Sequence, residues 1–402
     1  MTIAIIGAGA SGLLAALAAA RTGASVLLLE RQARVGRKLL ATGNGRCNLS
    51  NIHADVTNYH GEDPAFVRPS LTVFSQTDTI TFFERLGLYT VTEDSGKVYP
   101  YSDQANSVVD VLRFALEQSN IQLITGAEVS KVKMAEGKFQ ITATERFEAD
   151  KLIVACGGAA GSKLGGTLSG YQILRSFGHK CTRLRPSLVQ LKSSYPRCPA
   201  LKGIRAQAAL TITKDREPFA QSQGEVQFTD YGISGPTVFE ISRDVAAAKG
   251  NWEAVLDLLP GMEWDVFTTL LKQRLQTDRC AEDLLTGILH NRLGKILIQE
   301  AGISLNTPCR DLSETELRRV FETVRGFRLT ITESMGLDGA QVTAGGILTK
   351  EFDPATLESR KVSGLYACGE VLDIDGDCGG FNLQWAWSSG YVAGTSAGKA
   401  AL

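Results

Sequence analysis

The spacing of glycines at the N-terminus is the feature that most constrains what this chain of 402 residues can fold into. An apolar run at residues 3–6 leads directly into Gly7, Gly9 and Gly12, which follow the pattern G-x-G-x-x-G. In such a pattern the first glycine permits a tight turn, the second lets the backbone approach a pyrophosphate, and the third lets a helix pack against the strand. The segment therefore predicts a strand, a turn and a helix that bind a dinucleotide. A purely structural βαβ turn is the alternative.

The residues after the glycines support the same interpretation. A helix rich in Ala and Leu is expected from Ser11 to Thr22, with its positive end directed at the phosphates. A second strand is expected from Ser25 to Leu29, and Glu30 at its tip can accept hydrogen bonds from a ribose diol. The residues predicted to bind the cofactor in this segment are Gly7, Gly9, Ala10, Ser11, Gly12, Glu30 and Arg31.

A second glycine-rich segment near the C-terminus indicates which dinucleotide is bound. The apolar run at 362–368 ends in Gly369 and Glu370, and a helix is expected from Asn382 to Ala400 after a pair of glycines. In FAD domains built from two distant segments, such a carboxylate meets the ribityl chain. The helix start can face the flavin pyrimidine ring, where its dipole stabilises the negative charge of the reduced flavin. We therefore expect FAD rather than NAD, against the alternative of a terminal structural helix.

Composition and cysteine usage narrow the class of protein. With 44% apolar and 21% charged residues, and with no apolar run near the ~18 residues that span a bilayer, an ordinary soluble protein without membrane contact is expected. The N-terminus lacks a basic leader and begins directly with the first strand, which predicts no signal peptide. Eight cysteines and four histidines form no C-x-x-C motif and no cluster, which predicts no metal site and a cytoplasmic location.

The order of strand and helix patterns predicts a discontinuous α/β architecture. Residues 1–185 and 341–402 are expected to form one Rossmann-like FAD-binding domain made of two halves. This domain is interrupted by a β-rich inserted domain at 186–259 and 326–340 and by a helical subdomain at 260–325.

Hydrophobic periodicity predicts individual elements within these domains. In the first domain we expect helices at 69–86 and 107–118, a strand at 122–125, a meander at 128–133 and 139–144, and a buried parallel strand at 151–154. In the insertion we expect strands at 187–193, 204–214, 225–229 and 327–332, and helices at 264–277, 282–289, 292–301 and 314–324. Ser313 and Glu316 are expected to form a capping box at the last helix.

Four stretches of sequence resemble the signatures of one protein family. They are TGNGRCNLSN at 42–51, TDYGISGP at 229–236, AQVTAGG at 340–346, and GEVLDID at 369–375 followed by GGFNLQWAWSSG at 379–390. Over essentially its whole length the chain is similar to the YhiN/BaiN-like flavoproteins, a family of NAD(P)/FAD-dependent oxidoreductases. The resemblance implies a glutathione-reductase-type FAD domain with an inserted β-barrel-like and helical region. It also implies redox activity on substrates that differ between members: steroid-like enones, amines, or uridine in ribosomal RNA.

The resemblance completes the set of candidate cofactor-binding residues. These are Arg37, Lys38, Thr42, Gly43, Asn44, Gly45, Arg46, Val129, Cys156, Gly157, Gly158, Gly369, Glu370, Gly380, Phe381, Asn382 and Leu383. Cys156 stands where the family has Thr in Ala-Thr-Gly-Gly, and Cys378 precedes the second glycine pair. Because neither lies in a C-x-x-C motif, a packing role is favoured for both over a redox role.

Cys47, Arg46 and Asn382 are the candidate catalytic residues. Cys47 follows Arg46 in a polar loop expected to reach the flavin, and a neighbouring guanidinium favours a thiolate. A purely structural Cys47 is the alternative. Asn382 stands at the predicted start of the helix that faces the flavin ring.

The middle of the chain contains no second strand-G-x-G-x-x-G-helix unit, so NAD(P)H is expected to dock only transiently. The favoured hypothesis is hydride transfer through flavin N5 to an electron-poor C=C bond of an enone-like or uracil-like small molecule or nucleobase. One alternative is a small-molecule, amine-type oxidase that uses oxygen. The other is a flavin-carrying binding or electron-transfer protein without catalytic activity.

Charge is distributed unevenly along the chain. The segment 151–214 contains eleven Lys or Arg and no Asp or Glu, although the net charge of the chain is −1. Such a block favours contact with an anionic partner such as RNA. Dispersed, solvated charges are the alternative.

Overall fold

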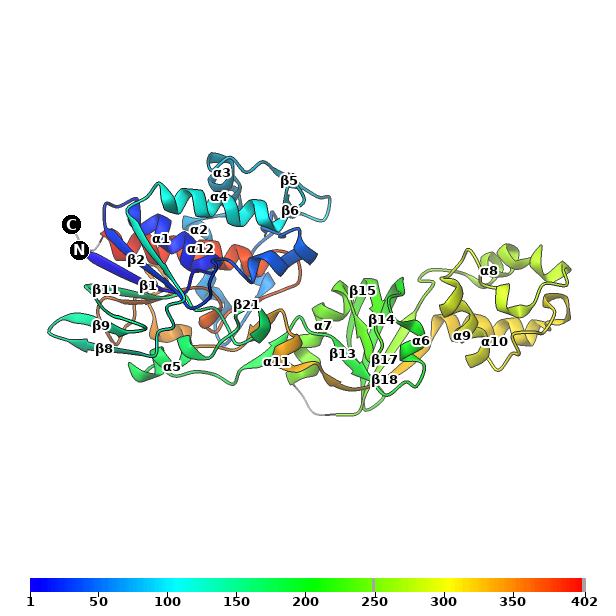
Figure 1. The fold of residues 1–402 in the computed structure, drawn as a ribbon. Coiled ribbons are helices and arrows are strands. Elements are labelled where there is room, and N and C mark those ends of the chain that lie inside the picture. The colour runs from blue at the N-terminus through cyan, green and yellow to red at the C-terminus, as the bar shows by residue number, and fades with distance from the viewer. Residues whose placement is uncertain (248–249, 400–402) are drawn as a thin grey trace. The chain divides into compact units, whose positions relative to one another are not determined.

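The computed structural model describes residues 1–247 and 250–399, so the predicted helix end at Ala400 lies outside the described residues (Figure 1). The chain divides into two compact units, one of Met1–Ser187 with Leu337–Leu402 and one of Leu188–Gly336. Both ends of the chain therefore build the first unit. The β-rich and helical parts of the insertion share the second unit, and the separate boundaries proposed for them remain predictions.

The first unit is organised around a five-stranded parallel sheet. Its strands, in spatial order, are β20 (Leu365–Ala367), β11 (Lys151–Val154), β1 (Thr2–Ile6), β2 (Ser25–Glu30) and β7 (Ile121–Thr125). The central strand β1 pairs in parallel with both β11 and β2. Strands β11, β1 and β2 are nearly continuous buried apolar runs, as expected for the interior of a parallel sheet that is covered on both faces, whereas the edge strand β7 is partly exposed.

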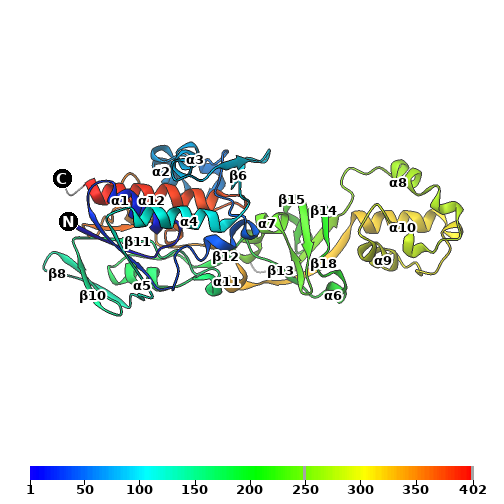
Figure 2. The same ribbon diagram turned by 45° about the horizontal axis from the view of Figure 1, so that its top comes forward.

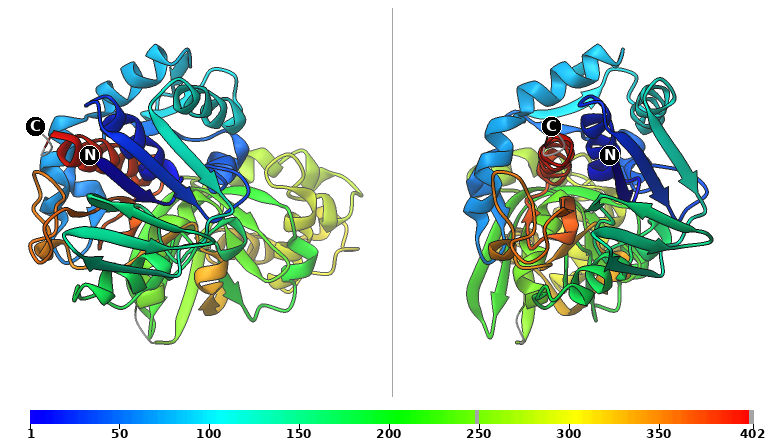
Figure 3. Two further views of the ribbon diagram at one scale, coloured as in Figure 1. Left: turned by 60° about the vertical axis from the view of Figure 1, so that its left-hand side comes forward. Right: turned by 90° about the vertical axis from the view of Figure 1, so that its left-hand side faces the viewer.

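Helices α1 (Ala10–Ala20) and α12 (Phe381–Lys399) pack against each other and join the two ends of the chain (Figures 1 and 2). The contact depends on glycines spaced four residues apart on α12. A Cβ atom on Gly390 would lie 2.3 Å from the carbonyl oxygen of Ser11, and one on Gly394 would lie 2.2 Å from that of Ala15. Residues four apart share one face of a helix, so these glycines allow the two backbones to approach closely. Figure 3 shows the blue N-terminal and red C-terminal segments side by side.

The predicted meander is a three-stranded antiparallel sheet in the order β10-β9-β8. Its strands are β8 (Lys131–Ala135), β9 (Lys138–Thr142) and β10 (Arg146–Ala149). Strand β8 begins three residues later than expected, and β10 was not predicted. The remaining helices of this unit include α4 (Ala105–Glu117), which was predicted, and α5 (Ser169–Ser176).

The helix predicted at 69–86 is two helices, α2 (Arg68–Val73) and α3 (Gln76–Arg85). The break lies at Phe74 and Ser75, and Ser75 begins α3 with a capping box. Its Oγ accepts a hydrogen bond from the Asp78 amide, and the Asp78 carboxylate accepts one from the Ser75 amide. A serine that satisfies the free amides of a new helix start competes with continuation of the preceding helix.

Short antiparallel pairs complete the first unit. They are β3 (Ser50–Asn51), β6 (Lys97–Pro100) and β5 (Thr90–Thr92) in one sheet, β4 (Tyr59–His60) with β21 (Asp375–Gly376), and β12 (Arg185–Ser187) with β19 (Val342–Ala344). Two of these pairs join segments more than a hundred residues apart.

The second unit contains a closed six-stranded barrel. Its strands, in order, are β13 (Leu191–Ser193), β16 (Gly232–Ser234), β15 (Glu217–Phe228), β14 (Arg205–Lys214), β17 (Trp252–Asp257) and β18 (Phe327–Ser334). The strands predicted at 204–214 and 327–332 are confirmed as β14 and β18. Strand β17 and helix α7 (Pro236–Ala247), which packs against β15, were not predicted.

The helical part of the second unit contains α8 (Trp264–Leu271), α9 (Asn291–Glu300) and α10 (Glu314–Arg325). The capping box of Ser313 and Glu316 at the start of α10 is confirmed. The helix expected at 282–289 was wrong: only the single 3-10 turn Ala281–Asp283 forms there. Gly287 has φ +80°, a left-handed conformation that ends any helix through this segment.

Candidate cofactor site

The turn between β1 and α1 contains three glycines, and packing within the protein requires only two of them, Gly7 and Gly12, to lack a side chain. A Cβ on Gly7, which has φ +103°, would lie 2.5 Å from the carbonyl oxygen of Ala155, and a Cβ on Gly12 would lie 1.8 Å from that of Gly7. By contrast, a Cβ on Gly9 would meet no protein atom within 4 Å. The space beside Gly9 is therefore open at the N-terminus of α1, where the free amides of the first turn can bind a pyrophosphate.

Glu30, at the tip of β2, is held beside this turn. Its Oε2 accepts a hydrogen bond of 2.7 Å from the Ala8 amide, and its Oε1 accepts one of 2.8 Å from the Gln32 amide. The carboxylate therefore has a fixed position next to the glycines, and its binding of a ribose stays a prediction. Neighbouring Arg31 instead donates to the carbonyl oxygens of Gly165 and Gly166 at 2.9 and 3.2 Å.

A second carboxylate lies where three distant segments meet. The Nζ of Lys38 is 2.9 Å from Oε2 of Glu370, and the Thr343 amide donates to Oε1 of Glu370 at 2.8 Å. A Cβ on Gly158 would lie only 2.3 Å from this same Oε1. The predicted residues Lys38, Gly158 and Glu370 are thus brought together, and Gly158 must be a glycine for Glu370 to occupy this position.

The end of β20 is attached to α12 by two buried side chains that sequence reasoning did not single out. The Gly369 amide donates to Oγ of Ser389 at 2.9 Å, and Nε1 of Trp385 donates to the Gly369 carbonyl at 3.2 Å. Gly369 has φ +75°, so the chain turns sharply here. Both side chains belong to the WAWSSG sequence, which was recognised only as a family signature.

The loop at 42–51 packs over the start of α12. A Cβ on Gly380 would lie 2.4 Å from the carbonyl oxygen of Ser50, and Oγ of Ser50 donates to Oε1 of Gln384 at 2.6 Å. Nε1 of Trp387 donates to the Leu49 carbonyl at 2.9 Å. Two family motifs, at 42–51 and 379–390, therefore meet at the start of a 19-residue helix.

Asn382, predicted to be catalytic, uses its amide group to hold the backbone in front of its own helix. Its Oδ1 accepts from the Gly376 amide at 2.8 Å, and its Nδ2 donates to the Gly376 carbonyl at 2.7 Å. These bonds make Asn382 a positioning residue for the loop before α12. Phe381 contributes its carbonyl oxygen, which accepts from the Tyr59 hydroxyl at 3.1 Å.

The hypothesis that Arg46 activates Cys47 is not supported. The Arg46 guanidinium is bonded to Asp103, lies 3.3 Å from Glu93 and stacks over the ring of Tyr99 at 4.1 Å. The Cys47 side chain is completely buried, and desolvation raises the pKa of its thiol to about 11. A thiol in such surroundings stays protonated, because burial penalises the charged form more than the hydrogen bond with Thr42 favours it.

Cys156 is likewise a packed thiol. Burial raises its pKa to about 12, and its Sγ lies 3.5 Å from the Ile6 carbonyl oxygen at the end of β1. A Cβ on Gly170 would lie 2.9 Å from the Cys156 Cβ, so the side chain fills a tight space. The packing role favoured for Cys156 agrees with this environment.

The other predicted cofactor-binding residues are spread around these contacts. Arg37 donates to Oε1 of Gln32 at 2.7 Å, and Oγ1 of Thr42 donates to the Leu39 carbonyl at 2.7 Å. Val129 is buried. Three more, Gly43, Asn44 and Gly45, have φ of +56°, +57° and +88° in the loop that leads to β3. Asn44 and Gly45 are exposed, while Gly157 has φ +71° beside the site of Glu370.

The acid-free segment 151–214 is not an unbalanced basic surface where it crosses the second unit. Four of its cations there form ion pairs with carboxylates from elsewhere in the unit. The pairs are Lys192 with Glu333, Arg197 with Glu300, Lys202 with Asp230, and Arg205 with Glu225. A count along the sequence could not reveal this, because the barrel brings the acidic partners from other strands and helices.

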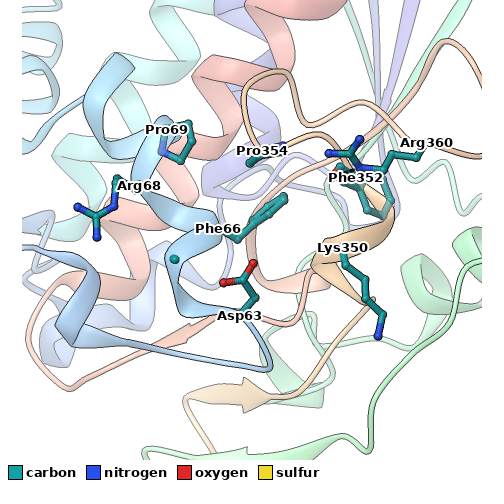
Figure 4. A pocket seen from close by; sticks show the side chains of 9 residues that line it. Asp63, Phe66, Arg68, Pro69, Lys350, Phe352, Pro354 and Arg360 are labelled. Atoms are coloured by element: carbon teal, nitrogen blue, oxygen red, sulfur yellow. Dashed lines mark hydrogen bonds between the residues drawn. The ribbon is translucent and has the colours of Figure 1, made fainter.

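A separate cavity of about 410 Å³ lies in the first unit, between the start of α2 and the segment at 350–360 (Figure 4). Phe66 and Phe352 are its buried walls, and Asp63, Lys350 and Arg360 also line it. None of the predicted cofactor-binding residues lines this cavity. Within the described residues, no helix is both long and apolar enough to cross a membrane.

Comparison with known proteins gives a consistent result. Residues 1–396 match the family described as HI0933-like protein Rossmann domain. The chain is 42% identical to a 3-dehydro-bile acid delta(4,6)-reductase from Clostridium scindens, covering 99% of each chain. It is 30% identical to a ribosomal RNA dihydrouridine synthase from Haemophilus influenzae, covering 98% of this chain and 97% of the relative. The open conformation of a flavocytochrome c3 fumarate reductase has a similar fold, with a TM-score of 0.51 and 14% identity over 100% of this chain and 79% of that chain.

Proposed function

The chain belongs to the HI0933-like Rossmann family and is a flavoprotein oxidoreductase, and on this premise we propose that it reduces an electron-poor C=C bond with FAD as cofactor and NAD(P)H as hydride donor. The family match confirms the predicted resemblance to the YhiN/BaiN-like flavoproteins. It also agrees with the predicted fold class, a two-half Rossmann-type domain interrupted by a barrel-containing insertion.

The observation that carries the proposal is the 42% identity, over 99% of the chain, to a reductase named for a conjugated double-bond system. The more distant relative is named for dihydrouridine formation. The two reactions share one chemistry, because their substrates, a 4-ene-3-ketone and a uracil ring, both present a C=C bond conjugated with a carbonyl group. Hydride adds to the carbon β to the carbonyl and a proton adds to the α carbon, so NAD(P)H, a proton and the alkene give NAD(P)⁺ and the saturated product.

The residues of the first unit suit this chemistry. Bound FAD supplies a two-electron carrier that accepts hydride from NAD(P)H and donates it to the alkene. The amides beside Gly9 would hold the pyrophosphate, and Glu30 would bind the adenosine ribose. Glu370, held by Lys38 and the Thr343 amide, would face the ribityl chain. The amides at the start of α12 would stabilise negative charge on the pyrimidine side of the reduced ring.

We propose a small enone-type substrate rather than RNA. The higher identity to the bile acid reductase supports this choice. The pairing of four basic residues of the 151–214 segment with carboxylates supports it as well, because paired cations contribute little to a phosphate-binding surface.

The test is an anaerobic titration of the purified protein with FAD bound. We expect NADPH or NADH to bleach the visible flavin absorbance, and a 4-ene-3-ketosteroid to restore it with one saturated ketone formed per NAD(P)H consumed. The matched control is the corresponding saturated 3-ketosteroid, which has the same ring scaffold without the double bond and should restore nothing.

Three outcomes would contradict the proposal. Rapid recovery of the absorbance with oxygen alone, with peroxide released and no response to the enone, would identify an oxidase. Recovery of the flavin absorbance only with a ribosomal RNA transcript would identify uridine in RNA as the substrate. The affinity for RNA should then fall steeply with added salt. If neither NADPH nor NADH bleaches the flavin, NAD(P)H is excluded as the donor.

A further inference from the structure

Lys97 places a positive charge beside the start of α12. It stands on β6 opposite Asn51 of β3, and Nδ2 of Asn51 donates to the Gly379 carbonyl at 3.0 Å. A Cβ on Gly379 would lie 3.6 Å from Cε of Lys97, so the end of this side chain is next to the glycine pair that precedes the helix. Lys97 is only partly buried, so a ligand at the helix start can approach its ammonium group.

The charge of Lys97 differs from that of the other cations near the cofactor site in having no counter-charge. Nζ of Lys38 lies 2.9 Å from Glu370, and the Arg46 guanidinium is bonded to Asp103. In residues 1–247 and 250–399, no carboxylate pairs with Lys97 and its Nζ donates no hydrogen bond. The field of a paired cation is largely cancelled by its partner, whereas that of an unpaired cation acts on whatever binds beside it.

The first turn of α12 is accessible and carries positive charge of its own. The amides of residues 381–383 precede the first backbone bond at this end, which runs from the Gln384 amide to the Gly380 carbonyl at 3.0 Å. Asn382 and Leu383 are only partly buried. The free amides of a first turn and the helix dipole both favour negative charge, so Lys97 adds a whole charge to the partial charge of the helix end.

We propose that Lys97 stabilises the negative charge that the pyrimidine side of the flavin ring gains on reduction, and so raises the midpoint potential of the bound FAD. This inference rests on the FAD site of the proposed function and adds a residue that was absent from the predicted cofactor-binding set. Because the oxidised ring is uncharged, an ammonium group beside it favours the reduced form over the oxidised form. Lys97 acts through its charge alone and exchanges no proton with the substrate.

The test measures the midpoint potential of the FAD-bound protein during reduction in the presence of a dye of known potential. Lys97→Met keeps most of the side chain and removes the charge. Its ratio of affinities for reduced and oxidised FAD should fall about tenfold, which for a two-electron couple lowers the midpoint potential by about 30 mV. Lys97→Arg keeps the charge and should change this ratio less than about threefold.

Two further measurements separate this role from a structural one. Lys97→Met should bind oxidised FAD within about threefold of the wild-type affinity, and its apoprotein should melt at the wild-type temperature, because the ammonium group has no protein partner to lose in the described residues. The matched control is Lys399→Met, which removes the same charge from the last turn of α12, roughly 27 Å along the helix at 1.5 Å per residue. It should leave the midpoint potential unchanged.

The inference is overturned if Lys97→Met has the wild-type midpoint potential, or if it weakens the binding of oxidised and reduced FAD equally. It is also overturned if Lys399→Met shifts the potential as much as Lys97→Met does, because net charge would then account for the effect. These results leave the proposed function intact, since enone reduction by the wild-type holoprotein is measured separately. If the wild-type protein binds no FAD, both the inference and the FAD site are wrong.

Discussion

Lys38 Nζ lies 2.9 Å from Glu370 Oε2, although 332 residues separate the two in sequence. The pair joins the loop after β2 to the end of β20, so the two halves of the first unit meet at one carboxylate. The same carboxylate accepts the Thr343 amide and touches Gly158.

Glu370→Ala should weaken FAD binding by roughly 10- to 100-fold, because it removes an acceptor that bonds to a cation and to a backbone amide at the cofactor site. The measurement is fluorescence titration of the apoprotein with FAD. Lys350→Met is the matched control, since Lys350 is exposed, lies 3.8 Å from Glu62 and should leave the affinity unchanged. Equal affinities for the Glu370 variant and the wild type would contradict the assigned role.

Gly9→Ala should leave the apoprotein as stable as the wild type and yet prevent FAD binding. The added methyl group meets no protein atom within 4 Å, so only the cofactor would collide with it. Gly12→Ala is the contrasting variant, because its Cβ would lie 1.8 Å from the Gly7 carbonyl oxygen and should destabilise the apoprotein itself. Apoprotein melting temperatures and FAD titrations distinguish the two. If the Gly9→Ala protein bound FAD with normal affinity, the pyrophosphate could not lie beside Gly9.

Cys47 should resist alkylation in the folded protein. Its pKa of about 11 leaves a thiolate fraction near one in a thousand at pH 8, and the buried side chain is closed to reagents. Peptide mapping after treatment with iodoacetamide should find Cys47 unmodified in native protein and modified after denaturation in urea. Cys47→Ala should reduce the rate of flavin bleaching by NAD(P)H less than about threefold, because only a reactive thiolate would contribute to this step. Rapid alkylation of Cys47 in the native protein would show that its thiol is accessible and ionised, and would contradict this prediction.

Stability should fall as the pH drops below about 6.5, the ordinary pKa of histidine. His179 is buried, bonds to Glu351 and Ser359 at 2.9 Å each, and stacks on Phe352. Desolvation lowers its pKa despite the opposing effect of Glu351, so the unfolded chain binds a proton that the folded chain excludes. The stabilising effect of the neutral imidazole is therefore complete above pH 6.5 and is lost at lower pH.

Melting temperatures from pH 8 to pH 5 test this expectation. His179→Gln, which does not titrate, should show a shallower decline than the wild type. His53→Gln changes an exposed histidine and should follow the wild-type curve. Parallel curves for all three proteins would assign the acid sensitivity to other groups, such as the carboxylate of Glu351. The hydrogen bonds from Lys361, the Lys180 amide and His179 lower the pKa of that carboxylate in spite of its desolvation.

Local sequence patterns were sufficient to predict the elements that combine a clear hydrophobic period with glycine or capping residues at their ends. The turn at Gly7–Gly12, helix α1, strand β2 and the capping box of Ser313 were predicted within a residue or two. The errors arose where one residue overrides a favourable pattern. Ser75 starts a new helix inside the span expected for one, and Gly287 prevents a helix in an otherwise amphipathic segment.

The sequence by itself determined the Rossmann turn, the contribution of both ends of the chain to one domain, and the family, because these depend on local spacing and on motifs that stand intact in the chain. Only the tertiary structure decided what single side chains do. Arg46 is next to Cys47 in sequence but bonds to Asp103, while Lys38 meets a partner from the opposite end of the chain. Burial and hydrogen-bond partners depend on residues far away in sequence, and they set the protonation state of a thiol such as that of Cys47.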